Sequence, residues 1–295
     1  MKYKGVLYNM SGWSQFFFFC FLAFSGYILA LLLLLVTVDI HAISESIHTM
    51  RIAMFIQSVC IFFIPSIAFI YLCQENPNSY LGIGKKQRND IQLLVLCVIL
   101  IVVIQPLITS ISYYNQQLVL PESMASLQNW MRESEESAKK SFSLLFADKS
   151  ISGFFLNLFI LAVVAGIVEE FFFRGCLQQI VQRIVINQHL TIWITAIIFS
   201  AIHFQFYGFV SRLLLGALLG YIFVWSRNIW IPVLVHIAHN AINVLFAFLY
   251  FGTEKYEQYE NFSISERWSI ILPSLLISVS LLTLIYRKRH KIEIL

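Results

Sequence analysis

The chain has 295 residues, of which 59% are hydrophobic and only 12% are charged, and its mean hydropathy is +0.76. Soluble domains carry about 25% charged residues, so this chain lacks the polar surface needed to cover a water-soluble body of its size. The formal net charge of +4 is too small to support binding to nucleic acid. Composition therefore predicts an integral membrane protein with membrane lipids around it and no nucleic-acid partner.

Apolar stretches recur along the whole chain. A helix needs about 20 mostly apolar residues to cross a bilayer. Eight stretches approach this length, near residues 14–38, 52–73, 91–112, 151–173, 190–206, 209–226, 229–251 and 268–286. No small-residue cleavage site follows the first, which predicts a retained anchor and not a signal peptide. The predicted fold class is all-α, a polytopic transmembrane helix bundle of about eight spans.

The basic residues predict an orientation, because Lys and Arg gather in short cytoplasmic loops. With eight spans, alternate loops share a side, and the opposite loops are richer in acidic residues. Both termini are therefore predicted to be cytoplasmic, where a basic tail suits an anionic leaflet. One side then collects most of the 20 basic residues, namely Lys2, Lys4, Lys85, Lys86, Arg88, Arg174, Arg183, Arg227, Arg287, Lys288, Arg289 and Lys291.

The chain divides into four predicted parts. Residues 1–112 hold three N-terminal spans, 113–150 form an extramembrane amphipathic loop, 151–251 form the core, and 252–295 carry the last helix and a basic cytoplasmic tail. Within the loop, the stretch from Met124 to Phe146 spaces its apolar residues as a helix does. This predicts either an amphipathic helix that lies on the membrane or over the next span, or a plain solvated helical loop.

Charged residues within the fourth span indicate a specific role, because a charge in hydrocarbon costs free energy. Glu170 and Arg174 are four residues apart, so they can pair on one face of a helix. Glu169 points about 100° away and is left without that partner. A free carboxylate can act as a base or bind a metal. The alternative is that both acids mark a helix end at the interface, where they cost little.

Polar residues also interrupt two later spans. His203 lies late in the fifth, where a lone histidine is either functional or a hydrogen-bonded structural residue. In the seventh, His236, Asn240 and Asn243 share one helical face, and His239 lies at its edge. Such a face cannot contact lipid, because unsatisfied polar groups there cost several kcal/mol. It is expected to face the bundle interior or a water-filled cavity.

These side chains together suit hydrolysis. Histidine serves as a general base or a metal ligand, a carboxylate can transfer a proton, and an amide can donate to an oxyanion. Two histidines and a carboxylate also match a hydrolytic zinc site with one position open for water. The sequence offers no convincing serine nucleophile and no Gly-rich phosphate loop. These side chains therefore best suit hydrolysis by an activated water.

Three motifs in order resemble a known family, the CPBP intramembrane proteases, which include the CAAX prenyl endopeptidases and bacterial Abi-type proteins. Their placement on successive spans fits as well. The motifs are Glu169-Glu170-x-x-x-Arg174, Phe199-x-x-x-His203, and His236-x-x-x-Asn240 with Pro232 before it. The resemblance implies an intramembrane endopeptidase of a bacterial cytoplasmic membrane, acting on a peptide or protein substrate that includes membrane-anchored ones.

The resemblance also implies catalytic roles. Glu169 and His203 would activate the attacking water. His236 and Asn240 would stabilise the oxyanion or complete the site, in a cavity open toward the cytoplasm. His239 lies outside the core motif and is expected to be a packing or supporting residue, like Asn243.

Cofactor and supporting residues follow from the same resemblance. Glu170 and Arg174 would support the catalytic residues. Family members have been described both as metalloproteases and as glutamate-dependent enzymes, so the cofactor stays open. Zinc, where present, would be held by Glu169, His203 and His236.

Two other functions compete with a protease. The same polar cluster can hold together a non-catalytic membrane scaffold or immunity-type protein that sequesters a partner. It can also serve as the proton relay of a transporter. The lack of visible internal repeats argues against the transporter.

Overall fold

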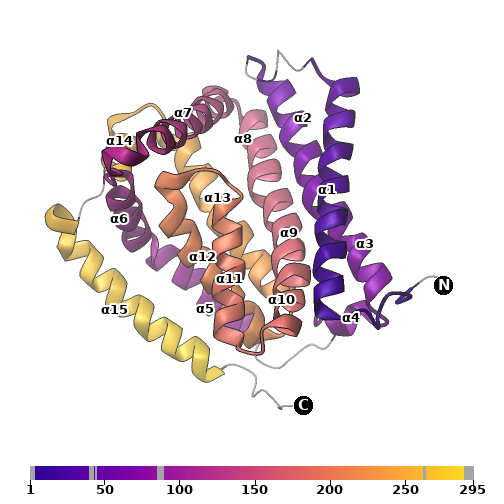
Figure 1. The fold of residues 1–295 in the computed structure, drawn as a ribbon. Coiled ribbons are helices and arrows are strands. Elements are labelled where there is room, and N and C mark those ends of the chain that lie inside the picture. Colours follow the sequence, from indigo (N-terminus) through magenta and orange to yellow (C-terminus); the bar gives the residue numbers. More distant parts are fainter. Residues whose placement is uncertain (1–3, 40–42, 44, 85–89, 262–263, 289–295) are drawn as a thin grey trace.

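A computed structural model describes residues 4–39, 43, 45–84, 90–261 and 264–288. Within these ranges the chain is helical and forms no strand, which confirms the predicted all-α fold (Figure 1). The first half contains α1 Gly12–Thr37, α2 Ile47–Ser58, η2 Val59–Phe63, α3 Ile64–Cys73, α4 Pro77–Tyr80, α5 Asp90–Val103, α6 Gln105–Gln116, η3 Glu122–Met124 and α7 Ala125–Ala147. The second half contains α8 Ile151–Asn157, η4 Leu158–Val164, α9 Ala165–Glu170, η5 Phe171–Leu177, α10 Gln178–Ile184, α11 Gln188–Ala201, η6 Phe206–Gly208, α12 Phe209–Ser226, α13 Trp230–Tyr250, α14 Glu254–Glu260 and α15 Ile264–Lys288.

The number of spans differs from the prediction. Among the described residues, six helices are long and apolar enough to cross a membrane, or seven if α5 and α6, bent by 46°, form one span. The predicted fifth span corresponds to α11, which has only 14 residues. At 1.5 Å per residue it is about 21 Å long, short of a hydrocarbon core of about 30 Å. The polytopic helical bundle is confirmed, and the count of about eight is corrected to six or seven.

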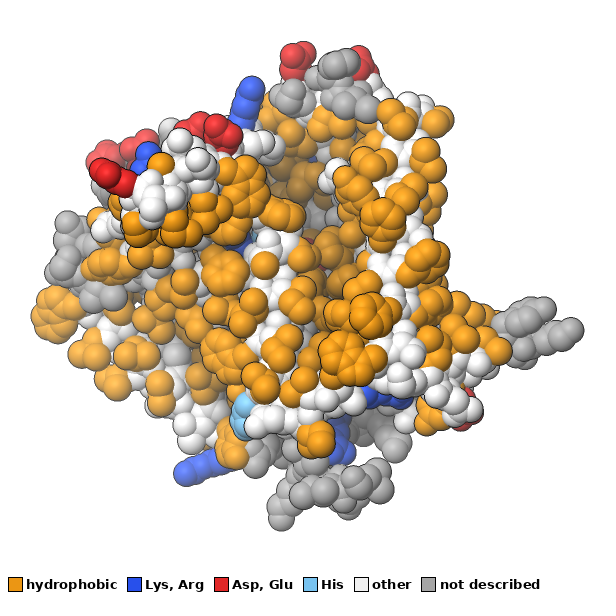
Figure 2. Space-filling view, in the orientation of Figure 1, with side chains coloured by type: hydrophobic (Ala, Val, Ile, Leu, Met, Phe, Trp, Pro, Cys, Tyr) orange, Lys and Arg blue, Asp and Glu red, His pale blue; other side chains and the backbone are white. Residues whose placement is uncertain are grey.

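The helices divide the molecule into two ends. The start of α1, the end of α15 and α4 lie at one end, which we call the terminal end, and α7 and α14 lie at the other, the α7 end (Figure 1). Figure 2 shows a broad hydrophobic face between them, with charged side chains gathered toward both ends. This is the distribution expected of a bundle that crosses a bilayer. Of the predicted cytoplasmic cations, Lys2, Lys85, Lys86, Arg88, Arg289 and Lys291 lie outside the described residues.

Helix α1 packs closely on the second span through small residues. Its buried positions include Gly26 and Ala30, one helical turn apart. A methyl group added at Gly26 would overlap the carbonyl oxygen of Cys60, in the π-helical turn η2. Small residues at such spacing let two membrane helices approach backbone to backbone.

Gly26→Ala is therefore expected to destabilise the protein, since the added methyl forces α1 away from η2. Overpacking of this kind costs about 1–3 kcal/mol. The midpoint of thermal unfolding in detergent checks it, with Ser25→Ala as the control, because Ser25 is the half-buried neighbour whose hydroxyl donates to the Phe21 carbonyl oxygen of its own helix. Equal midpoints for the two variants would contradict the close approach.

The amphipathic stretch predicted from Met124 to Phe146 is confirmed as a helix, α7, and it covers the bundle. Its Leu145 and Phe146 are buried. At its other end, the ring of Trp130 lies 6.3 Å from that of Phe204 and 5.1 Å from that of Phe206, both in the α11–α12 connection. Helix α7 is thus a cover over the connection that follows α11 and not a plain solvated loop.

The junction between α7 and α8 is fixed to the second span. Arg51 is buried on α2, and its Nη2 lies 3.1 Å from Oδ2 of Asp148. Its Nε donates to Oδ1 of Asn157 at 2.9 Å. Hydrogen bonds from Ser150, with Arg51 adding to them, lower the pKa of the Asp148 carboxyl. The carboxylate therefore stays charged and holds α7 in place.

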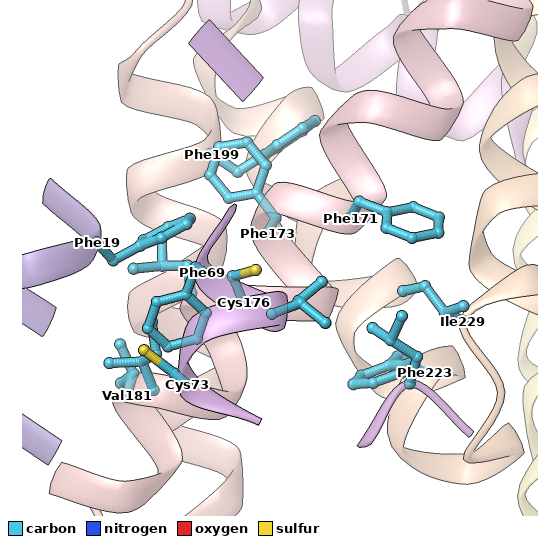
Figure 3. Close-up of a cluster of buried hydrophobic side chains, with 14 of the residues drawn as sticks. Phe19, Phe69, Cys73, Phe171, Phe173, Cys176, Val181, Phe199, Phe223 and Ile229 are labelled. Carbon is cyan, nitrogen blue, oxygen red and sulfur yellow. The ribbon is translucent and has the colours of Figure 1, made fainter. Parts of the chain in front are cut away.

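An aromatic core lies between α1, α3 and the helix that carries the glutamate pair (Figure 3). Phe19 of α1 and Phe69 of α3 pack edge to face at 5.3 Å. Phe173 meets Phe199 of α11 in the same way at 5.0 Å. These rings exclude water from one flank of the polar residues described next.

Candidate functional site

The glutamate pair lies deep in the bundle. The helix formed by α8 to α10 runs without a break from Ile151 to Ile184, 34 residues. Glu170 is 14 residues from its end, or about 21 Å. The two acids therefore do not mark the end of a helix. The sequence pattern predicted that this span ends near residue 173, because charged residues in an apolar stretch usually mark its boundary.

Two π-helical turns flank the pair. The short α-helical segment α9 ends at Glu170 and lies between η4 and η5. Such turns are rare and occur often at functional sites, because each one rotates the following side chains relative to a regular helix. This local feature was invisible in the sequence, where a regular helical period was assumed.

Glu170 is the centre of a buried network. Its Oε1 accepts hydrogen bonds from Nη1 of Arg174 at 2.6 Å and from Nδ1 of His236 at 2.8 Å. The three side chains are 0%, 1% and 3% exposed. Nη2 of Arg174 donates to the carbonyl oxygen of Gly216 at 2.8 Å. The predicted Glu170–Arg174 pair is confirmed, and the network ties the fourth span to α12 and α13.

Arg174 is enclosed by aromatic rings. Its guanidinium carbon lies 5.1 Å from the centre of the Phe199 ring and 5.9 Å from that of Phe173. The Phe199 ring also lies edge to face against His203 at 5.1 Å and His236 at 6.1 Å. The prediction that Arg174 is a cation of a cytoplasmic loop is wrong, because the side chain lies inside the bundle.

Glu169 points elsewhere, as the helical spacing predicted. Its side chain is 17% exposed, and its Oε2 lies 3.9 Å from Nε2 of His236. That distance is too long for a direct hydrogen bond. His236 thus stands between the two acids, with Nδ1 fixed on Glu170 and Nε2 turned toward Glu169.

His203 lies just beyond the end of α11. Its Nδ1 donates to the carbonyl oxygen of Phe199 at 2.7 Å, because a carbonyl can only accept, so Nε2 carries the lone pair of the neutral ring. Its ring is close enough to Glu169 and His236 to interact with both electrostatically. The structure therefore brings Glu169, His203 and His236 into one neighbourhood.

Asn240 makes a contact of a different kind. Its Nδ2 donates to the carbonyl oxygen of Leu161 at 3.0 Å, inside the π-helical turn η4. This bond ties α13 to the turn that precedes the glutamate pair. The amide keeps a second hydrogen that this bond does not use.

His239 and Asn243 form a separate cluster. Nδ1 of His239 lies 3.0 Å from Nε2 of Gln105, and its Nε2 lies 3.2 Å from Nδ2 of Asn243. Both ring nitrogens are thus engaged by amides, from α6 and from α13 itself. This arrangement agrees with the packing or supporting role expected for the two residues.

Two cavities lie beside the site on its α7 side. One of about 400 Å³ is lined by Asn240, Gln205 and α7 residues that include Phe142. The other, of about 370 Å³, is lined by His239, Arg212 and Phe142. They share the walls formed by Phe142 and Asn243. The cavities approach the site from the α7 end.

Sequence reasoning missed the polar groups that hold the connection after α11. Nη1 of Arg212 donates to Oε1 of Gln205 at 3.0 Å, and its other terminal nitrogen donates to the Gln205 carbonyl oxygen. Nδ2 of Asn115 donates to the carbonyl oxygen of Phe206 at 2.7 Å. A charged or amide residue inside an apolar stretch was the available signal.

The implied zinc ligands do not fit a metal ion as they are arranged. Among the residues that the structure describes, no three His, Cys, Asp or Glu side chains form a cluster able to hold one. Nδ1 of His203 and Nδ1 of His236 donate to oxygen acceptors, so each ring keeps its lone pair on Nε2, the nitrogen that a metal would take. Because the described side chains form no such cluster, we derive no catalytic step through a metal.

The architecture and site define a class, a helical membrane protein with a carboxylate–histidine site at the middle of its bundle. Residues 151–242 match the model of the Rce1-like family, described as type II CAAX prenyl endopeptidase Rce1-like. This segment contains all three motifs, and the match confirms the resemblance predicted from them. Residues 151–242 are thus similar to a CAAX-type endopeptidase family.

Two curated relatives are similar over part of the chain. An uncharacterized protein YpbD of Bacillus subtilis (strain 168) is 26% identical over 102 residues, 33% of this chain and 47% of the relative. An uncharacterized 24.3 kDa protein of Escherichia coli is 29% identical over 113 residues, 37% of this chain and 52% of the relative. The chain thus spans about half the length of the curated relatives it matches. No solved structure shows a significant match.

Proposed function

We propose that this protein is an intramembrane endopeptidase that hydrolyses a peptide bond with a water held between Glu169 and His236. The observation that carries the proposal is the 3.9 Å separation between Oε2 of Glu169 and Nε2 of His236, with His236 fixed from behind by Glu170. At such a distance one water can bridge two acceptors. The match of residues 151–242 to a CAAX endopeptidase family supports the reaction class.

The hydrogen bonds assign the proton path. Because Nδ1 of neutral His236 donates to Glu170, its Nε2 is an acceptor and helps to hold the water. Glu169 removes a proton from that water, and the hydroxide adds to the scissile carbonyl carbon. When the tetrahedral intermediate collapses, the C–N bond breaks and the leaving amine takes the proton from Glu169. We therefore assign His236 to the water and not to the oxyanion.

The remaining two residues complete the proposed site. The second amide hydrogen of Asn240 is available to the oxyanion, since the first is on Leu161. We assign Nε2 of His203, which carries the lone pair, to accept a hydrogen bond from Glu169 once that carboxylate is protonated. Removing one such oxyanion donor typically lowers the rate 10²–10³-fold.

Access is proposed from the α7 end, where the two cavities adjoin Asn240 and His239. Two of the basic residues that predict the orientation lie at the terminal end: Arg183 in the last turn of α10, beside the start of α1, and Arg227 directly after α12. If that end is cytoplasmic, as the basic residues predict, the site is reached from the opposite side. With access from the α7 end, the predicted orientation and the predicted opening toward the cytoplasm do not hold together.

Cysteine labelling is expected to decide the orientation. In a Cys20→Ser background, which removes the exposed native thiol, Ser137→Cys on α7 and Ser79→Cys on α4 place single exposed thiols at opposite ends. A membrane-impermeant maleimide added to intact cells is expected to label the Ser137→Cys protein, and to reach the Ser79→Cys protein only after permeabilisation. The reverse pattern would place the α7 end in the cytoplasm.

The proposed function is tested by comparing cleaved peptides in membranes of cells that carry the wild type or Glu169→Gln. New termini are expected with the wild type and not with Glu169→Gln. Glu133→Gln, the same change on the exposed face of α7, is the matched control and is expected to behave as the wild type. Identical cleavage products with Glu169→Gln would refute the proposed mechanism.

A further inference from the structure

A second large cavity lies away from the catalytic residues, on the other face of α12. It has a volume of about 600 Å³ and lies between α6, α12 and α15, with the start of α11 at one end. In Figure 1, α15 slants away from α11 and α12. The walls are almost entirely apolar and include Ile108, Leu218 and Leu282. We call this space the α15 groove.

The groove does not belong to the proposed active site. Gly216 and Gly220 of α12 face the fourth span, where their carbonyl oxygens accept from Arg174 and Gln178. Leu218 lies on the opposite side of the same helix and lines the groove. A peptide in the groove would also leave its backbone N–H and C=O groups without partners on an apolar wall.

One end of the groove is polar and aromatic. Nδ1 of His189 and Oη of Tyr221 are hydrogen bonded at 2.8 Å. Beside them, the rings of Trp225 and Tyr286 meet edge to face at 5.9 Å. Three of these residues lie within a turn or so of helix ends at the terminal end, His189 at the start of α11, Trp225 near the end of α12 and Tyr286 near the end of α15. We call this the groove mouth.

Two cationic residues directly follow a residue of the groove mouth in the sequence. Arg287 and Lys288 directly follow Tyr286 and form the last turn of α15. Nζ of Lys288 donates to Oε1 of Gln92, which fixes it near the start of α5. Tyrosine and tryptophan typically lie at the level of lipid headgroups, and cations there attract anionic lipids. The apolar body, the aromatic mouth and the adjacent cations follow the order of a phospholipid from chain to headgroup.

We propose that the α15 groove binds one acyl chain of an anionic phospholipid, with its headgroup at the groove mouth. The volume falls within the range of small-molecule sites, about 300–1,000 Å³. Its walls are membrane spans, so hydrocarbon is the medium that reaches it. His189 and Tyr221 supply polar hydrogen-bonding groups for the ester or phosphate oxygens, and Arg287 and Lys288 supply the charge. The bound lipid would fill the space that separates α15 from α12.

Binding is measured on the purified protein by native mass spectrometry with phosphatidylglycerol and phosphatidylcholine of identical acyl chains. Leu218→Trp fills the groove and is expected to weaken phosphatidylglycerol binding about tenfold, since excluding even two methylene groups has that effect. Leu276→Trp, on an exposed face of α15, is the matched control and is expected to change nothing. Equal binding by both variants and the wild type would overturn the site.

The headgroup has its own test. The wild type is expected to bind phosphatidylglycerol more tightly than phosphatidylcholine, and Arg287→Gln with Lys288→Gln is expected to remove that preference. Equal affinity of the wild type for the two lipids would overturn the anionic headgroup. A dimer of the wild type that dissociates in Leu218→Trp would assign the groove to a second copy of the chain and overturn the proposal.

A second measurement needs no variant. Phosphatidylglycerol with a photoreactive diazirine at the end of its acyl chain is irradiated with the wild-type protein, and the cross-linked residues are mapped. Cross-links are expected on α6, α12 and α15, around Ile108, Leu218 and Leu282. Cross-links spread evenly over the exposed face of α1 would contradict a bound chain in the groove.

Discussion

Replacing Arg174 with methionine is expected to lower the free energy of unfolding by roughly 3–5 kcal/mol, the cost of leaving a buried partner charge uncompensated. The guanidinium is 1% exposed and pairs at 2.6 Å with Glu170, which is fully buried. Methionine fills a similar volume but offers no hydrogen bond to Oε1 of Glu170 or to the Gly216 carbonyl oxygen. Unfolding in detergent, followed by the thermal midpoint, measures the loss.

Two controls separate charge from volume. Arg183→Met makes the same change at an exposed position nine residues further along the helix, and it is expected to cost less than about 0.5 kcal/mol. Glu170→Gln combined with Arg174→Met removes both charges and is expected to be more stable than Arg174→Met alone. If Arg174→Met unfolds at the same temperature as Arg183→Met, the network does not hold the bundle together.

The helical fold could be predicted because a bilayer allows few solutions. Apolar stretches of about 20 residues have to be helices there, and each predicted span corresponds to a helix or a helix group. The short α11 was the exception, because the apolar pattern continues through Ile202 and Phe204 after the helix has ended. Phe204 has a left-handed φ of 53°, which sequence pattern does not reveal for an aromatic residue.

The break after α11 depends on distant partners. Asn115 of α6 holds this connection through both ends of its amide, by donating to the Phe206 carbonyl oxygen and accepting from the Val210 N–H. These residues are more than 90 positions apart in the chain. Local propensity therefore could not place the end of α11, nor His203 beyond it.

At the candidate site, too, contacts within one helix could be predicted, and contacts between distant residues could not. The Glu170–Arg174 pair follows from helical spacing alone, so it was found. The contact between Glu170 and His236 joins residues 66 positions apart and exists only after α13 packs on α9. Arg174 was read as a loop cation because charge in an apolar stretch usually marks its end. The site residues could be named from motifs, while their division into a buried network and a free acid needed the packed bundle.

Glu169→Gln is expected to lower the cleavage rate by about 10²–10⁴-fold, the usual contribution of a general base, while leaving the unfolding midpoint unchanged. The side chain is partly exposed and lies 3.9 Å from His236, so little stabilising contact is lost. The rate is measured with purified protein and a substrate found by the membrane comparison. Glu133→Gln is the control for loss of one negative charge.

The variant Glu170→Gln provides a direct comparison for Glu169→Gln. Glu170→Gln changes the side chain by the same atoms, one position away, but it weakens a buried ion pair and the hydrogen bond that orients His236. It is therefore expected to lower both the unfolding midpoint and the rate. If Glu169→Gln also lowers the midpoint as much as Glu170→Gln does, both acids are structural and the polar cluster supports a scaffold. If only the rate falls in Glu169→Gln, the free carboxylate is the base.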